Sequence, residues 1–268
     1  MLLTVDVGNT DTCFGVWQTE KLTHLWRAES ATRRTADEYA VLLGELFRGA
    51  GFGFTDVEDV VIGSVVPAVT RMLRWMTEKY TGRPALVISG DSDHGLPMEV
   101  ESSAEVGADR VVNCIAALAH HRPPLTVIDF GTATTFDVVD KSGVFRGGLI
   151  VPGIRTGLEA LAARAARLAS VEVHEPRTVV GASTVRAMAS GVYWGEVARV
   201  EGILARIEEE QGAKMTVLAT GGLAPLVAQG SRRIQEVRED LTVEGLRLVW
   251  KRMRGLASPA KPPKRKRR

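Results

Sequence analysis

The chain has 268 residues, of which 45% are hydrophobic and 25% charged, a balance typical of folded globular proteins rather than disordered or fibrous ones. Its length suits one large domain or two of about 130 residues, because domains commonly contain about 100–200 residues. No apolar run approaches the roughly 18 residues of a membrane span, so we expect a cytoplasmic protein with no membrane partner. Cys13 and Cys114 have neither the spacing of a zinc site nor that of a disulfide framework.

The net charge of +2 hides an uneven distribution of charge along the chain. The last eight residues carry six positive charges, and without them the remaining 28 basic residues face 32 acidic ones, a net charge of −4. A body of that sign gives no electrostatic reason to expect a nucleic-acid partner. Residues 257–268, rich in proline and basic residues, are predicted to form a disordered basic tail, for which a solvated terminus is favoured over a nucleic-acid role.

The first half alternates predicted strands and helices. Residues 2–7 and a segment through Phe14, Val16 and Trp17 are predicted strands joined by a polar hairpin turn. A capping box at residues 35–38 begins a helix that ends near residue 49 or 51. The pattern then predicts a strand at 60–66, a helix from residue 67 and a strand at 85–89. This alternation indicates an α/β sheet.

The second half repeats the alternation. A helix is predicted over residues 104–121 and a strand over 125–129. Further elements are predicted as strands at 136–139 and 144–151, helices at 153–168 and 183–211, a strand at 216–219 and a last helix at 242–253.

Two short segments, one in each half, nearly repeat each other. LTVDVG at residues 3–8 aligns with TVIDFG at residues 126–131, so that Asp6 corresponds to Asp129 and, further along, Thr12 to Thr135. Because the match falls at the start of each half, we expect two similar domains facing across a cleft, with a boundary near residues 115–124.

The residues of these paired turns suit phosphate binding. Glycines 8 and 131 allow backbone N–H groups to approach phosphate oxygens, and the hydroxyls of threonines 10, 12, 132 and 134 are further donors. The carboxylates of Asp6 and Asp129 would repel phosphate unless a cation lies between them, which predicts a nucleotide with Mg²⁺. One such turn alone is more often ordinary hairpin chemistry, but two copies and the later Gly221-Gly222 pair favour the nucleotide.

This combination resembles the acetate-kinase, Hsp70 and actin superfamily. More specifically, five segments stand in the order and spacing of the type III pantothenate kinases: GADRVVN (107–113), DFGTATTFD (129–137), GGLIVPGI (147–154), GASTVRAMASG (181–191) and ATGGLA (219–224). The resemblance covers about residues 1–253 and implies an α/β fold of two ribonuclease-H-like domains, each a mixed sheet plus helices, with an ATP cleft between them. We place these domains at residues 1–118 and 119–256.

The resemblance also implies an activity, the transfer of the ATP γ-phosphoryl group to pantothenate as the first step of coenzyme A biosynthesis. Asp109 would be the general base, although an aspartate in the first turn of a helix often only complements the helix dipole. The implied pantothenate contacts are Gly107, Ala108, Asp109, Arg110 and Thr184, although Arg110 alone could be a surface ion-pair residue and Thr184 part of a helix cap.

ATP and cations are implied at the paired turns. The implied ATP contacts are Asp6, Val7, Gly8, Asn9, Thr10, Asp11, Thr12, Cys13 and Thr132. Asp129 would bind an activating monovalent cation, K⁺ or NH₄⁺, unless it only caps its own turn. The apolar stripe of Ile154, Leu158, Leu161, Ala165 and Leu168 is interpreted first as core. Because the second domain of this family also builds the homodimer interface, the resemblance implies a homodimer.

Several positions depart from the family pattern. Asp11 stands where the family usually has Asn, Val100 where it commonly has Tyr, and Ser103 near an expected Pro. These departures and the basic tail leave open a second hypothesis, a kinase-like nucleotide-binding regulatory protein without pantothenate turnover. A kinase of another small hydroxyl substrate is a third hypothesis.

Overall fold

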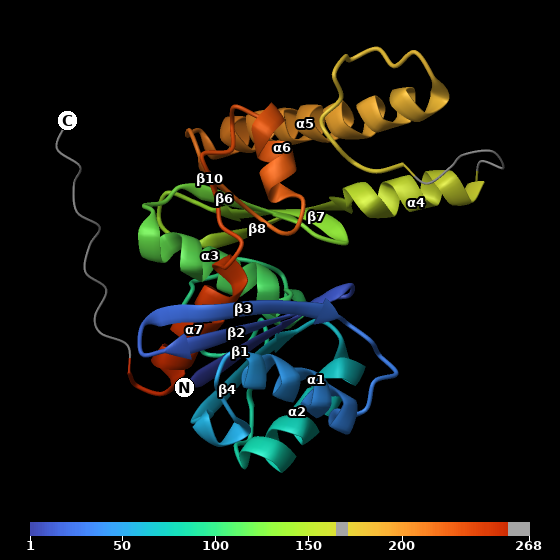
Figure 1. Ribbon diagram of the computed structural model, residues 1–268. Coiled ribbons are helices and arrows are strands. Elements are labelled where there is room, and N and C mark those ends of the chain that lie inside the picture. The colour runs from blue at the N-terminus through green and yellow to red at the C-terminus, as the bar shows by residue number, and fades with distance from the viewer. Residues whose placement is uncertain (165–170, 257–268) are drawn as a thin grey trace. The chain divides into compact units, whose positions relative to one another are not determined.

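The computed structural model describes residues 1–164 and 171–256, which form two compact units (Figure 1). Among the described residues, the first unit contains Met1–Leu96, Glu101–Ala116 and residues 240–256, and the second contains Pro97–Val100 and Ala117–Glu239. Each unit is built on a five-stranded mixed sheet flanked by helices. The predicted α/β fold of two mixed sheets with helices is therefore confirmed.

The first sheet has the strand order β3-β2-β1-β4-β5. Its strands are β1 (Leu2–Val7), β2 (Asp11–Gln18), β3 (Lys21–Glu29), β4 (Asp59–Ser64) and β5 (Leu86–Ile88). β1 pairs antiparallel with β2 and parallel with β4. The sequence prediction missed β3, where Trp26 and Ala28 pack against the core while Arg27 and Glu29 are exposed. Such a half-buried edge strand shows only the period-2 alternation.

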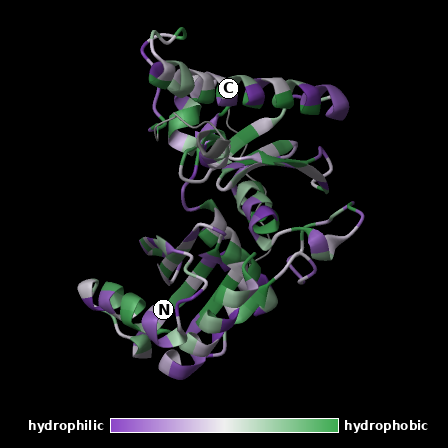
Figure 2. Ribbon diagram, turned by 90° about the vertical axis from the view of Figure 1, so that its right-hand side faces the viewer, coloured by the Kyte–Doolittle hydropathy of each residue, from purple (hydrophilic) through white to green (hydrophobic). Residues whose placement is uncertain are grey.

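Helices cover both faces of this sheet. On one face, α1 (Ala36–Gly49) and α2 (Pro67–Thr81) pack on side chains such as Leu3 and Val5. On the other face, α3 (Ala108–His120) and α7 (Leu241–Met253) pack on Leu2 and Val61. Figure 2 shows mainly hydrophobic residues along the strands and a mixture of hydrophobic and hydrophilic residues on the helices. Such a mixture is typical of helices that pack one face on a sheet and expose the other.

The predicted capping box of α1 is confirmed. The backbone N–H of Thr35 donates to Glu38 Oε2 at 2.7 Å, and the backbone N–H of Glu38 donates to Thr35 Oγ1 at 3.3 Å. These two bonds satisfy N–H groups that the first turn of a helix otherwise leaves without a partner.

The last helix joins the first unit rather than the second. Residues 240–256 cluster with the first sheet, because Val243, Leu246 and Val249 of α7 are buried against it. A Cβ atom on Gly245 would lie 2.0 Å from the carbonyl oxygen of Val112, so the backbones of α7 and α3 are in close contact. The first unit is therefore not one continuous segment, in contrast to the predicted domains at residues 1–118 and 119–256.

The second sheet has the order β10-β9-β6-β7-β8. Its strands are β6 (Leu125–Phe130), β7 (Ala133–Val139), β8 (Phe145–Pro152), β9 (Thr216–Thr220) and β10 (Glu236–Val237). The helices α4 (Ile154–Arg164) and α5 (Thr184–Gln211) lie between β8 and β9 in the chain, and α6 (Ala224–Gly230) lies between β9 and β10. Ile128 and Phe136 of the strands share one core with Tyr193 and Val200 of α5. A helix was predicted at residues 153–168, and the structure has α4 over Ile154–Arg164. The last predicted residues, 165–168, lie outside the described residues.

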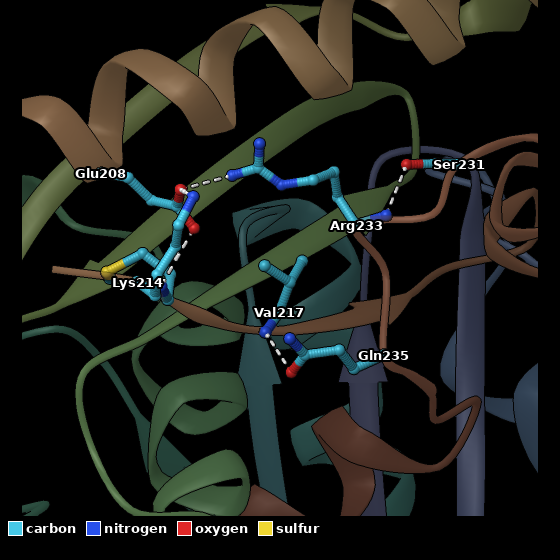
Figure 3. Close-up of polar contacts among 7 residues, drawn as sticks. Glu208, Lys214, Val217, Ser231, Arg233 and Gln235 are labelled. Carbon is cyan, nitrogen blue, oxygen red and sulfur yellow. Dashed lines mark hydrogen bonds and ion pairs between the residues drawn. The ribbon is translucent and has the colours of Figure 1, made fainter.

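The end of α5 is tied to the second sheet by a charged cluster (Figure 3). Glu208 accepts hydrogen bonds from Lys214 at 2.8 Å and from the backbone of Met215 at 3.1 Å, and pairs with Arg233 at 2.8 Å. Burial acts to raise the pKa of Glu208, but the bonds from Lys214 and Met215 and the charge of Arg233 lower it below its ordinary value. Among the described residues, no helix combines the length and apolar character needed to cross a bilayer.

We expect that Gly245→Ala destabilises the protein by about 1–3 kcal/mol, because the added methyl group must separate α7 from α3. Gly202→Ala is the matched control, since its Cβ would lie 3.7 Å from Arg206 Nη1, an ordinary contact within α5. The control should be neutral or stabilising by up to about 1 kcal/mol. Chemical denaturation measures both, and equal stability of the two variants would contradict the close contact.

Candidate functional site

The first polar turn joins β1 to β2. The backbone N–H of Gly8 donates to the carbonyl of Asp11 at 3.0 Å, and Asn9 and Thr10 are exposed at the tip. The hydroxyl of Thr12 points inward instead, is fully buried and lies 2.8 Å from Ser30 Oγ. The turn can therefore offer backbone N–H groups and small polar side chains at its tip, but not the Thr12 hydroxyl.

The second polar turn joins β6 to β7 and is hydrogen-bonded to residues at the start of α4. The backbone N–H of Gly131 donates to the carbonyl of Ala133 at 3.0 Å. The carbonyl of Thr132 accepts from Gly153 at 3.1 Å and from Thr156 Oγ1 at 2.7 Å, while the Thr132 side chain is exposed. These bonds fix the turn and leave its hydroxyl at the surface of the unit.

The two turns correspond, with one correction to the alignment. In the first hairpin Val7 lies opposite Thr12, whereas in the second Phe130 lies opposite Thr134. The second turn is therefore one residue shorter, and Thr12 corresponds to Thr134 rather than to Thr135. Both residues are fully buried, and Thr134 Oγ1 donates to Glu196 Oε1 at 3.1 Å. These two hydroxyls support the hairpins from within.

Asp109 lies in the first turn of α3, close to the first polar turn. The backbone N–H of Val65 donates to the carbonyl of Val7 at 3.1 Å, and a Cβ atom on Gly107 would lie 3.4 Å from Val65 Cγ1. Val65 thus links the GADR segment to the end of β1. The first unit therefore brings together two of the predicted site segments.

The carboxyl group of Asp109 is desolvated. Its Oδ1 accepts the backbone N–H of Arg110 at 2.9 Å, and the side chain is partly buried. Burial raises the pKa of Asp109 above its ordinary value, and the bond and charge of Arg110 offset this only in part. A carboxylate with a raised pKa is a better proton acceptor, as general-base catalysis requires.

Asp129 lies beside the glycine pair that follows β9. Gly221 has a φ of 89°, and a Cβ there would lie 2.5 Å from Asp129 Oδ1 and 2.7 Å from the Phe130 backbone. Only glycine suits such a position. The close contact of Gly221 with Asp129 and Phe130 brings together two segments that were predicted to bind the nucleotide. It gives Gly221 a structural role.

Thr184 is the first residue of α5 and is exposed. Ser183 is the N-cap, since its Oγ accepts from the backbone N–H of Arg186 at 3.3 Å, so Thr184 itself does not cap the helix. Thr184 precedes Glu196, which contacts the strand after the second turn, by twelve residues, or roughly 18 Å of helix. Thr184 therefore lies about three turns of α5 away from the residue that contacts the strand after the second turn.

The departures from the family pattern have defined positions. Val100 lies against Gly147, whose Cβ would be 3.9 Å from Val100 Cγ1. Ser103 opens a single 3₁₀ turn, Ser103–Glu105. Asp11 Oδ2 accepts from Arg27 Nη1 at 3.4 Å, so the extra carboxylate faces a cation.

Two residues near the turns were missed from the sequence. Arg27 was missed because β3 was not predicted, and the alternation around Trp26 and Ala28 is the signal that could have found it. Glu196 is 2% exposed, bonds to Thr134 and pairs with Arg199. Nothing in a long helix distinguishes such a buried glutamate from a solvated one.

The turns offer carboxylate oxygens as possible metal ligands. Among the described residues, no group of three or more His, Cys, Asp or Glu side chains could hold a metal ion by itself. Mg²⁺ commonly binds through one or two carboxylates, water and substrate phosphates, so Asp6 and Asp11 fit that requirement. The Asp129 carboxylate at the second turn offers the oxygen donors that a hard monovalent cation prefers.

A model of the type III pantothenate kinase family matches residues 2–206. The chain belongs to this family. The type III pantothenate kinases of Rhodospirillum rubrum and Syntrophotalea carbinolica are 47% and 44% identical to it. These alignments cover 94% and 95% of this chain and 98% and 100% of the relatives.

Solved structures with a similar fold are more distant in sequence. Component A of (R)-2-hydroxyglutaryl-CoA dehydratase from Acidaminococcus fermentans superposes with a TM-score of 0.51 at 14% identity, covering 92% of this chain and 95% of that one. The ethanolamine utilization protein EutJ from Carboxydothermus hydrogenoformans gives 0.52 at 15% identity, covering 92% and 88%. At such identities the likeness shows the fold alone.

We expect Asp109→Asn to be at least as stable as the natural protein at pH 8 without substrates. The pKa of Asp109 is raised on folding, so its ionisation disfavours the folded state above that pKa, and asparagine removes this cost. The advantage should shrink as pH falls through the raised pKa and vanish below about 3.9, the ordinary aspartate value.

Thermal unfolding across this pH range measures the effect, with Glu105→Gln, an exposed carboxylate nearby, as control. A destabilised Asp109→Asn at pH 8 would show that the carboxylate supports the fold instead.

Proposed function

We propose that this chain transfers the γ-phosphoryl group of ATP to the primary hydroxyl of pantothenate, forming 4′-phosphopantothenate and ADP at the first step of coenzyme A biosynthesis. Nearly full-length similarity to type III pantothenate kinases supports the reaction. The observation that carries the mechanism is the desolvated Asp109 carboxyl beside the first polar turn. The same similarity favours a kinase over a regulatory protein without turnover. ATP as a substrate is consistent with a cytoplasmic location.

Asp109 acts as the general base. Its carboxylate accepts the proton of the pantothenate hydroxyl while the hydroxyl oxygen bonds to the γ-phosphorus and the bond to the β-phosphate oxygen breaks. Arg110, next to it on α3, donates to the pantothenate carboxylate, and Gly107 and Ala108 shape the backbone around the substrate. Thr184 contributes a hydroxyl to pantothenate from the first turn of α5.

The two polar turns contact ATP. Backbone N–H groups of the segment from Asp6 to Cys13 and the exposed polar side chains at its tip bind the ATP phosphates, and the exposed Thr132 hydroxyl adds a donor. The Asp6 carboxylate, together with the ATP phosphates, would hold Mg²⁺, which would supply positive charge against the charge of the transition state. Asp129 would hold K⁺ or NH₄⁺, in which case activity should be higher in KCl than in NaCl at equal ionic strength.

We expect Asp109→Asn to lower kcat by about 10²–10⁴-fold, since asparagine cannot accept the proton. ADP release coupled to NADH oxidation, with the phosphorylated product identified by mass spectrometry, measures the effect. ATP affinity should change little, because Asp109 faces the acceptor.

Glu105→Gln is the matched control, since it changes an exposed carboxylate shortly before α3 and should keep full activity. Turnover of the Asp109→Asn variant within about threefold of the natural protein would remove Asp109 from its assigned role.

The second unit also forms a homodimer in this proposal. Exposed apolar side chains gather in the segments from β8 to the start of α5: Leu149, Ile150, Leu161, Val179, Val180 and Val185. Ile154 of the predicted stripe is buried core, whereas Leu161 is 47% exposed, and Ala165 and Leu168 lie outside the described residues. Apolar surface of this kind supports association.

We expect Ile150→Lys to shift the protein from dimer to monomer, because a charge replaces an apolar side chain that is 63% exposed. Val41→Lys is the matched control, with an exposed valine on α1 of the other unit. Sedimentation equilibrium measures both. A monomeric natural protein, or a dimer that Ile150→Lys leaves intact, would contradict the proposed interface.

A further inference from the structure

Arg27 lies in register with the acidic side chains of the first polar turn. Cys13 on β2 is opposite both Asp6 on β1 and Arg27 on β3. Residues directly opposite each other in adjacent strands project from the same face of a sheet. Cys13 packs against the core cluster that contains Ala108 of α3. Arg27 therefore projects from the face that carries the helix of Asp109.

The guanidinium of Arg27 is held only loosely. Its Nη1 donates to Asp11 Oδ2 at 3.4 Å, beyond the usual 2.7–3.2 Å range of such bonds. The two side chains are 44% and 40% exposed. Exposed pairs of this kind contribute little to stability. A guanidinium has five N–H donors, so one long bond leaves most of its capacity for other acceptors.

The carboxylates of Asp11 and Asp6 place negative charge near this guanidinium. Burial acts to lower the pKa of Arg27, but the nearby Cys13, Asp11 and Asp6 raise it above its ordinary value. ATP phosphates bound at the same turn would bring further negative charge next to the carboxylates of Asp6 and Asp11. Without a cation beside them, such like charges repel each other.

We propose that Arg27 binds the phosphate groups of ATP, and that Asp11 holds the guanidinium beside the turn until the nucleotide binds. The planar fork of arginine donors matches phosphate oxygens, and a charged hydrogen bond to phosphate is stronger than the long bond to Asp11. This inference rests on the proposed ATP-binding role of residues 6–13. It also explains how the turn tolerates a second carboxylate at position 11.

A narrower role for Arg27 makes a different prediction. If Arg27 only neutralised Asp11, removing both charges together would restore ATP binding. If Arg27 itself binds phosphate, the double variant stays defective. Comparing Arg27→Gln, Asp11→Asn and the double variant therefore separates the two roles.

The test measures KM for ATP at saturating pantothenate and the dissociation constants of ATP and AMP by titration calorimetry. Arg27→Gln should raise both the KM and the dissociation constant for ATP by about 10- to 100-fold, the loss of affinity expected for a hydrogen bond between charged groups. AMP affinity should fall much less than ATP affinity. The double variant should remain within about threefold of Arg27→Gln.

Arg48→Gln is the matched control, since Arg48 also pairs with a carboxylate, Glu45, on the surface of the first unit. Arg48→Gln should keep the KM and the dissociation constant for ATP of the natural protein. All variants should have nearly the same unfolding midpoint as the natural protein.

An active natural protein whose KM for ATP is unchanged by Arg27→Gln, or restored in the double variant, would overturn the inference. A natural protein without pantothenate turnover would instead contradict the proposed function.

Discussion

The packing of α7 against α3 is the constraint on which the first unit and its site segments depend. Gly245 brings the two backbones together at Val112, and Leu246 packs in the same core as Val61 of the central sheet. This contact sets α3 on one face of the sheet, with its first turn beside Val65 and the end of β1. A helix from the end of the described chain thus supports the helix that carries Asp109.

The balance of charge explains the chemistry of the two turns. In the proposed function both turns bind phosphate beside an aspartate, so cations must offset the negative charge. Mg²⁺ and a monovalent cation are expected beside Asp6 and Asp129, whereas Arg27 is a cation built into the first sheet. The additional carboxylate of Asp11 lies beside this arginine and accepts a long hydrogen bond from it.

Much of this could be predicted from the sequence, because local signals and motifs were strong. The capping box at Thr35, the paired hairpins and the order of motifs predicted elements and family. Hairpin length could not be predicted, so Thr12 was aligned with Thr135 although the shorter second turn makes Thr134 its counterpart. Contacts between distant segments, such as Glu196 with Thr134, leave no local pattern to recognise.

The proposed mechanism depends on Asp109 accepting the proton of the pantothenate hydroxyl. A crystal structure of the protein with pantothenate, Mg²⁺ and a non-hydrolysable ATP analogue tests it most directly. In that crystal the pantothenate hydroxyl oxygen should lie within about 2.6–3.2 Å of an Asp109 carboxylate oxygen, the reach of a general base. A hydroxyl bound to another acceptor, with the Asp109 carboxylate turned away from pantothenate, would contradict it.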